Sequence, residues 1–176
     1  GIGRRLAQCL SREFIDLDSL IEDREGLSIP QIFEGQGEEG FRRAETEAVK
    51  AVSGKQGGVI ACGGGVVIKE INMRTLSQNG IVVFMNRPVK DILESVNLKA
   101  RPLLSETPEK LYTLHNERLP LYEGYADFEV ECQGKPDEIL QQLIHISGLE
   151  QSEMKLAVIG DPIAHSLSPD IHIPAL

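Results

Sequence analysis

The chain has 176 residues, of which 41% are hydrophobic, enough for a globular domain with a core of its own. It carries 18 Lys and Arg against 27 Asp and Glu, a formal net charge of −9, which argues against a general nucleic-acid binder because phosphates require basic surface. No apolar run approaches the roughly 18 residues of a membrane helix, and no secretory signal pattern opens the chain. Three well-separated cysteines (Cys9, Cys62 and Cys132) form no CxxC pair, which argues against a disulfide framework or zinc site and favours a reducing, cytoplasmic location.

Helical and extended apolar periods alternate along most of the chain. Helices are predicted over residues 4–11, 38–52, 71–78, 89–96, 109–122 and 136–146. A further helix is predicted to start at Ser28, and the helix 109–122 is predicted to be interrupted at Pro120. The predicted strands cover 14–17, 59–62, 81–85 and 128–132, while 98–108 has no clean period and is predicted to be a loop. The wholly apolar strand 81–85 is typical of a parallel sheet covered on both faces. We therefore expect an α/β doubly wound parallel sheet, whose ligands bind at the carboxyl ends of its strands.

The pattern changes near the C-terminal end of the chain. Residues 150–153 form a short polar connector, 155–160 predict a new strand, and Ser168 opens a new helix. A strand and part of a helix cannot bury a core alone. The sequence therefore favours a domain over 1–149, a linker over 150–153 and the truncated start of a second α/β domain over 154–176.

Two carboxylates, Asp16 and Asp18, follow the first predicted strand. If the strand continues, period-two alternation places both on one side, where they can hold a metal ion or its waters and accept a hydroxyl proton. The alternative is a helix N-terminus, where the dipole favours Asp. On this motif alone we favour the helix N-terminus.

Four further features have both a structural and a functional interpretation. Arg42 and Glu45 lie three residues apart on a helix, so Arg42 either forms a surface ion pair or binds an anionic substrate. Three glycines, 63–65, follow a buried strand and can expose backbone N–H groups to a ligand. Arg101 lies in the predicted loop, as a surface residue or as a cation carried by a lid. Arg118 precedes Pro120, either as a helix C-terminal cation or as a second anion contact.

The order of these motifs carries more information than any one of them. DLD, FRRAE, GGG after a strand, RPLL and ERLPLY follow one another between residues 2 and 149, and this series closely resembles shikimate kinase. The resemblance implies a P-loop, nucleoside-monophosphate-kinase-like parallel sheet with helices on both faces. It also implies transfer of the γ-phosphate of ATP, with Mg²⁺, to the 3-hydroxyl of shikimate in chorismate and aromatic amino acid biosynthesis.

The resemblance assigns roles to residues on the acceptor side of this reaction. Asp18 corresponds to the acid that binds the shikimate hydroxyls and acts as base, and Asp16 to its partner near the magnesium waters. Arg42 and Arg118 match the arginines that bind the shikimate carboxylate. The backbone contact to shikimate is implied for the glycine pair Gly64 and Gly65.

On the nucleotide side the sequence both matches and departs from the family. Arg101 matches the lid arginine that reaches the phosphates of ATP. Glu94 stands where the family usually has an adenine-packing arginine, and Lys135 is a candidate substitute contact. The pattern G-x-x-x-x-G-K-[ST] does not occur in the sequence. This motif and the strand that leads into it would precede Ile2. We therefore expect a sheet that lacks its first, central strand. We also expect the fragment to be unstable or inactive on its own.

Residues 154–176 carry a second resemblance, to the start of shikimate dehydrogenase. It implies that Ser166 and Ser168 hydrogen-bond the shikimate carboxylate, although Ser168 alone is equally interpreted as a helix cap. The catalytic residues and the NADP-binding domain of that family would lie beyond Leu176, which leads us to expect a fused kinase–dehydrogenase polypeptide. Two alternatives stay open: an inactive fragment that keeps a shikimate pocket without binding ATP, and another small-molecule kinase of the same fold. We expect no nucleic-acid or membrane partner, and the sequence leaves the oligomeric state open.

Overall fold

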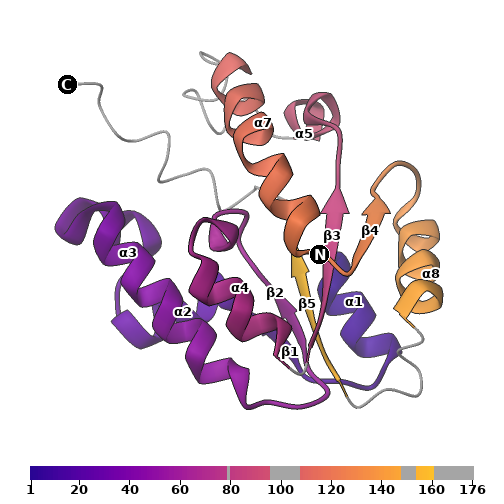
Figure 1. The fold of residues 1–176 in the computed structure, drawn as a ribbon, viewed down its shortest axis with the longest axis horizontal. Coiled ribbons are helices and arrows are strands. Elements are labelled where there is room, and N and C mark those ends of the chain that lie inside the picture. The colour runs from indigo at the N-terminus through magenta and orange to yellow at the C-terminus, as the bar shows by residue number, and fades with distance from the viewer. Residues whose placement is uncertain (79, 96–107, 148–153, 161–176) are drawn as a thin grey trace.

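Five parallel strands form a single sheet in the computed structural model of the chain, which describes residues 1–78, 80–95, 108–147 and 154–160. The strand order is β1-β2-β5-β3-β4, so β1 and β4 are the edges (Figure 1). The strands are β1 Phe14–Asp16, β2 Val59–Ala61, β3 Gly80–Asn86, β4 Phe128–Glu131 and β5 Lys155–Ile159. This architecture confirms the predicted α/β parallel sheet. Among the described helices, none is long and apolar enough to cross a membrane.

Most helices begin and end close to the predicted positions, whereas the one at Leu17–Glu25 was indicated only as the helix alternative at Asp16. The helices are α1 Ile2–Cys9, α2 Leu17–Glu25, α3 Ile29–Ser53, α4 Glu70–Ser77, α5 Val89–Ser95, α7 Pro108–Tyr125 and α8 Pro136–Ser147, with a 3₁₀ turn η1 at Val66–Ile68. In α3 the backbone N–H of Ser28 donates to Gln31 Oε1 at 2.8 Å, and the helix kinks at Gly37, whose φ is 68°. The kink explains why the periodicity predicted a start at Ser28 and a separate helix from residue 38. Helix α7 continues through Pro120, so the predicted interruption there was wrong.

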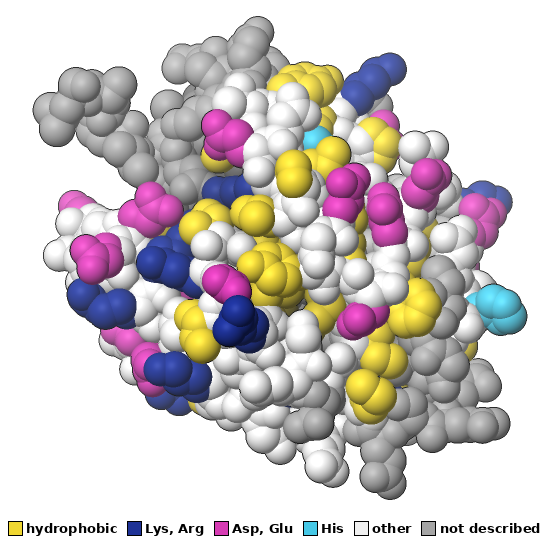
Figure 2. Space-filling view, in the orientation of Figure 1, with side chains coloured by type: hydrophobic (Ala, Val, Ile, Leu, Met, Phe, Trp, Pro, Cys, Tyr) yellow, Lys and Arg dark blue, Asp and Glu magenta, His cyan; other side chains and the backbone are white. Residues whose placement is uncertain are grey.

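Two hydrophobic clusters cover the two faces of the sheet. Helices α2, α3 and α4 pack on one face, and α1 and α8 pack on the other (Figure 1). A third small cluster joins α5 to α7 above the carboxyl end of β3. Figure 2 shows acidic and basic side chains interspersed on the visible face, with hydrophobic side chains exposed between them.

The C-terminal strand β5 lies at the centre of the sheet, between β2 and β3. All of its residues are buried, with Leu156 and Val158 in the cluster beneath α1 and α8 and Ala157 and Ile159 in the opposite cluster. Its backbone joins the neighbouring segments, since Leu156 N donates to Gly58 O at 2.8 Å and Cys62 N donates to Val158 O at 2.9 Å.

This placement corrects two expectations about the sheet. The gap expected at its centre does not exist, because residues 155–159 fill that position. The same residues were expected to open a separate domain, yet in the structure they belong to the sheet of residues 14–131. The physical reason is that an unfilled centre would leave both β2 and β3 with unpaired backbone groups. An apolar parallel strand satisfies these groups and buries side chains on both faces.

Lys155 is the one charged residue on β5, and its side chain is buried at the start of the strand. Its ammonium donates to the carbonyl of Ser53, at the C-terminal end of α3, over 2.7 Å. Burial lowers the pKa of Lys155 below the value near 10.5 of a free lysine. The folded chain therefore holds this proton less tightly than the unfolded chain does.

The pH dependence of the stability of a Lys155 variant tests whether this side chain is buried. The wild-type protein is expected to gain stability relative to Lys155→Met as the pH rises towards 10.5, because the penalty for burying the charge is lost once the unfolded chain also releases the proton. Urea unfolding of both proteins at pH 7, 9 and 10 measures this difference. A difference that stays constant across this range would mean that Lys155 is not buried.

Candidate functional site

Charged side chains from three helices meet beyond the carboxyl end of β2. Arg42 and Glu45 lie on α3, Asp18 on α2 and Arg118 on α7. The electrostatic environment of Glu45 includes Arg42, Asp18 and Arg118, which places each of these three groups within interaction range of Glu45. Three of the four side chains (Arg42, Glu45 and Arg118) are buried. The structure thus brings together side chains that lie up to 100 residues apart in the sequence.

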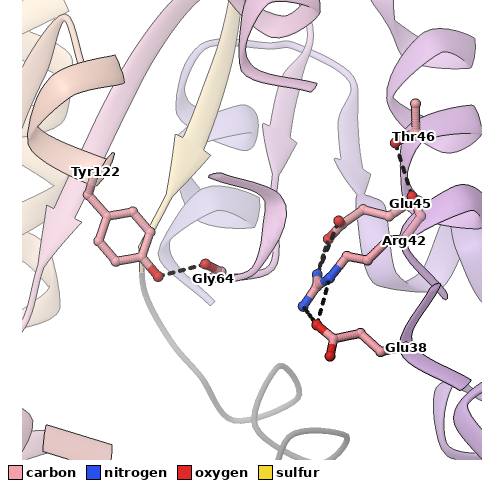
Figure 3. Close-up of polar contacts among 6 residues, drawn as sticks. All are labelled: Glu38, Arg42, Glu45, Thr46, Gly64 and Tyr122. Carbon is pink, nitrogen blue, oxygen red and sulfur yellow. Dashed lines mark hydrogen bonds and ion pairs between the residues drawn. The ribbon is translucent and has the colours of Figure 1, made fainter. Parts of the chain in front are cut away.

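Arg42 is held by two carboxylates of its own helix (Figure 3). Its Nη1 donates to both oxygens of Glu45, at 3.1 and 3.2 Å, and its Nε and Nη2 donate to Glu38 Oε1 at 3.4 Å. The arginine is 6% exposed and the Glu45 side chain is 2% exposed, so the predicted pair is buried rather than a surface ion pair. These hydrogen bonds to Glu45 and Glu38 fix the orientation of the Arg42 guanidinium, the side-chain group that binds carboxylates through its fork of N–H donors.

The glycine loop after β2 lies directly against Arg42. A Cβ placed on Gly65 would stand 2.8 Å from Arg42 Nη2 and 2.9 Å from Cζ, so the loop approaches the guanidinium as only glycine allows. On the far side of the loop, Tyr122 donates its hydroxyl hydrogen to the carbonyl of Gly64 at 2.6 Å (Figure 3). The glycine loop, which was predicted to contact the ligand through its backbone, therefore lies between α3, which carries Arg42, and α7, which carries Arg118.

Asp16 and Asp18 are arranged differently from a continuing strand. Strand β1 ends at Asp16 and α2 begins at Leu17, so the alternation that would place both carboxylates on one side of a strand does not apply. Asp16 Oδ1 accepts hydrogen bonds from the backbone N–H groups of Asp18 at 3.2 Å and Ser19 at 3.4 Å. Asp16 is thus an N-cap, as the helix interpretation predicted, and Asp18 lies in the first turn of α2.

A cavity opens beside this cluster, at the carboxyl ends of β3 and β5. Its lining includes Arg87, His115, Arg118, Tyr122 and Gly160. Arg118 and Tyr122 therefore face the space where the central strand ends, which is the usual ligand position in a parallel α/β sheet. Sequence patterns alone indicate no role for Arg87 or Tyr122, although the tyrosine belongs to the ERLPLY motif.

Burial and charge perturb two acidic groups of the site. Burial raises the pKa of Glu45, opposed by its ion pair with Arg42. Burial also raises the pKa of the Cys62 thiol, and the carboxylates of Glu45, Asp18 and Asp16 raise it further. The Cys62 thiol therefore stays protonated at physiological pH and does not act as a nucleophile there.

Thiol titration checks this environment. At pH 8, the exposed Cys9 is expected to react quickly with a disulfide reagent, whereas the buried Cys62 and Cys132 react only when the protein is unfolded. Spectrophotometric titration of the native and the urea-unfolded protein gives the fast and slow fractions. Fast reaction of Cys62, located by peptide mass mapping, would contradict the buried environment.

Among the remaining predicted residues, only Lys135 has a described side chain, and it lies away from this cluster. Lys135 is exposed at the start of α8, beyond the edge strand β4, at the opposite edge of the sheet from β1. Arg101, Ser166 and Ser168 lie outside the described residues, as does the side chain of Glu94.

The site offers a magnesium ion two carboxylate groups and not a full set of protein ligands. Within the described parts of the chain, no group of three His, Cys, Asp or Glu residues could hold a metal ion. Mg²⁺ in phosphoryl-transfer sites keeps several waters and takes one or two carboxylates together with substrate phosphates. Asp16 and Asp18, at the junction of β1 and α2, offer two carboxylates, the number that such an arrangement needs.

A parallel sheet with helices on both faces and a charged cluster at its carboxyl edge defines the class of doubly wound α/β proteins. Comparison with known proteins gives the particular family. The family model described as "Shikimate kinase" matches residues 1–147, and the chain belongs to the shikimate kinase family.

Individual relatives and solved structures agree with this assignment. The chain is 39% identical over 142 residues to shikimate kinase of Clostridium botulinum (strain Alaska E43 / Type E3), covering 81% of this chain and 86% of that protein. It is 42% identical over 146 residues to shikimate kinase of Vibrio cholerae (strain ATCC 39541), covering 81% and 84%.

Among solved structures, shikimate kinase from Acinetobacter baumannii in complex with shikimate matches with a TM-score of 0.76 and 38% identity, over 85% of this chain and 86% of that one. The Aquifex aeolicus enzyme matches with a TM-score of 0.71 and 36% identity, over 82% and 86%.

Proposed function

We propose that the cluster of Asp18, Arg42 and Arg118 around the glycine loop is the shikimate site of this kinase. The observation that carries the proposal is that two buried arginines from separate helices, Arg42 and Arg118, both act on Glu45, while Arg42 also lies against the glycine loop at Gly65. Two guanidinium groups neutralise and orient one carboxylate, while Asp18 accepts hydrogen bonds from the ring hydroxyls. The similar Acinetobacter baumannii enzyme is described in complex with shikimate, which supports the choice of substrate.

In the proposed reaction the 3-hydroxyl oxygen of shikimate forms a bond to the γ-phosphorus of ATP. The bond from that phosphorus to the β,γ-bridging oxygen breaks, ADP leaves, and the hydroxyl proton passes to the Asp18 carboxylate. Mg²⁺, held through water by Asp16, would supply charge neutralisation on the phosphates. Arg101 is proposed to contact the phosphates and Lys135 the nucleotide.

A second function rests on one sequence observation. The sequence contains no G-x-x-x-x-G-K-[ST] pattern, and the central strand β5 leads into Gly160-Asp161-Pro162. The alternative that we propose is shikimate binding through the arginine cluster without transfer of phosphate. Phosphate loops act through successive backbone N–H groups and a lysine, and this sequence does not repeat that combination.

One assay separates the candidates. The protein is incubated with MgATP and shikimate, and with gluconate or nucleoside monophosphates as alternative acceptors, and the phosphorylated product is identified by mass spectrometry. Formation of shikimate 3-phosphate alone supports the kinase. Shikimate binding without product supports the second function, and phosphorylation of another acceptor overturns the shikimate assignment.

The second resemblance stays a prediction. A fused shikimate dehydrogenase that uses NADP in a cytoplasmic polypeptide is proposed from the resemblance of residues 154–176, with Ser166 and Ser168, although residues 155–159 complete the sheet of this domain. The coding sequence on either side of these residues tests this proposal. A downstream reading frame without a dinucleotide-binding domain would refute it.

A further inference from the structure

Tyr122 connects the two halves of the candidate site. It lies one helical turn beyond Arg118 on α7, and its side chain is only 4% exposed. Its ring stacks on Phe84 of β3, with ring centroids 4.9 Å apart and planes 16° apart. Its hydroxyl donates to the carbonyl of the buried Gly64 at 2.6 Å. The ring is thus fixed by packing, and the hydroxyl by a buried hydrogen bond.

The glycine loop is held on both sides. Arg42 of α3 lies against Gly65, and Tyr122 of α7 binds Gly64 (Figure 3). The loop itself is shaped by the turn into η1, where Val66 N donates to Gly63 O at 3.1 Å. The loop therefore stands between the two helices that carry the predicted carboxylate-binding arginines.

We propose that Tyr122 is a positioning residue for substrate, which sets the glycine loop at a fixed distance from Arg118. The inference rests on the proposed function, because Arg118 and the loop must contact the same shikimate molecule. Without the hydroxyl, the buried Gly64 carbonyl loses its donor, and the loop moves independently of α7. Misplacement of one contact relative to the other weakens binding, although neither contact residue has changed.

The variant Tyr122→Phe removes the hydroxyl and retains the ring that stacks on Phe84. We expect its dissociation constant for shikimate, measured by isothermal titration calorimetry, to rise about tenfold, the equivalent of one buried hydrogen bond. The matched control is Tyr125→Phe, which makes the same chemical change one turn along α7, where the side chain is half-buried. The control should leave the dissociation constant unchanged.

Hydrogen exchange gives a second readout that a general loss of stability does not reproduce. Amides of the 62–68 segment should exchange faster in Tyr122→Phe than in the wild-type protein, with strands β2 and β3 unchanged. A lower melting temperature with unchanged shikimate affinity and loop exchange would overturn the inference and leave Tyr122 a structural residue. Failure of the wild-type protein to bind shikimate would instead overturn the proposed function, and loop exchange would still decide whether Tyr122 anchors the loop.

Discussion

Replacing Ala157 with aspartate is expected to destabilise the whole sheet. Ala157 is fully buried on the central strand β5, where it pairs with Ile60 of β2 and Val82 of β3. A carboxylate at this position has no cation beside it on either neighbouring strand. An uncompensated buried charge costs about 4 kcal/mol, a large part of the roughly 5–15 kcal/mol that stabilises a domain. We expect a melting temperature at least roughly 10 °C lower by circular dichroism.

A matched substitution at the edge of the sheet provides the control. Phe128→Asp introduces the same carboxylate on the edge strand β4, where the side chain is 38% exposed, and a much smaller loss is expected. Ala157→Ser gives an intermediate step if the aspartate variant does not fold. If Ala157→Asp melted like the wild-type protein, residues 155–159 would not be the central strand.

Replacing Arg42 with methionine is expected to abolish shikimate binding and also to destabilise the protein. The substitution removes one proposed carboxylate contact and leaves the buried Glu45 without the partner that now donates to both of its oxygens. Breaking a buried ion pair on one side costs about 3–5 kcal/mol. Urea unfolding and shikimate calorimetry measure the two effects separately.

The double variant Arg42→Met/Glu45→Leu distinguishes binding from folding. Because both charges are removed, the stability should return towards the wild-type value, whereas shikimate binding should stay lost. Arg43→Met is the matched control, since Arg43 is the neighbouring exposed arginine on α3 and should change neither quantity. Recovery of shikimate affinity in the double variant would show that Arg42 only stabilises the fold.

Local patterns predicted the elements of this fold but not the place of one of them. The apolar segment 155–160 was correctly predicted as a strand, because a run of buried side chains is a local property. Its position between β2 and β3 depends on pairing with segments roughly 70 to 100 residues earlier, which periodicity does not encode. The strand was therefore assigned to a separate domain, although it completes this sheet.

The candidate site shows the same division between local and long-range information. The pairing of Arg42 with Glu45 followed from a spacing of three residues on one helix. The Asp16 cap was also predicted, as the local alternative to a carboxylate pair. Tyr122 received no role because its partner Gly64 is 58 residues away, and nothing in either segment indicates the other.

Calorimetric titration of the wild-type protein with shikimate and with its methyl ester tests the central claim most directly. The claim is that two buried arginines bind the substrate carboxylate. Hydrogen bonds to charged groups contribute about 1.5–3 kcal/mol each, so the ester, which has lost the charge, should bind at least roughly tenfold more weakly. One molecule of shikimate bound per chain, with that discrimination, is the predicted result. Equal affinity for the acid and the ester, or no binding of shikimate by the folded protein, would contradict it.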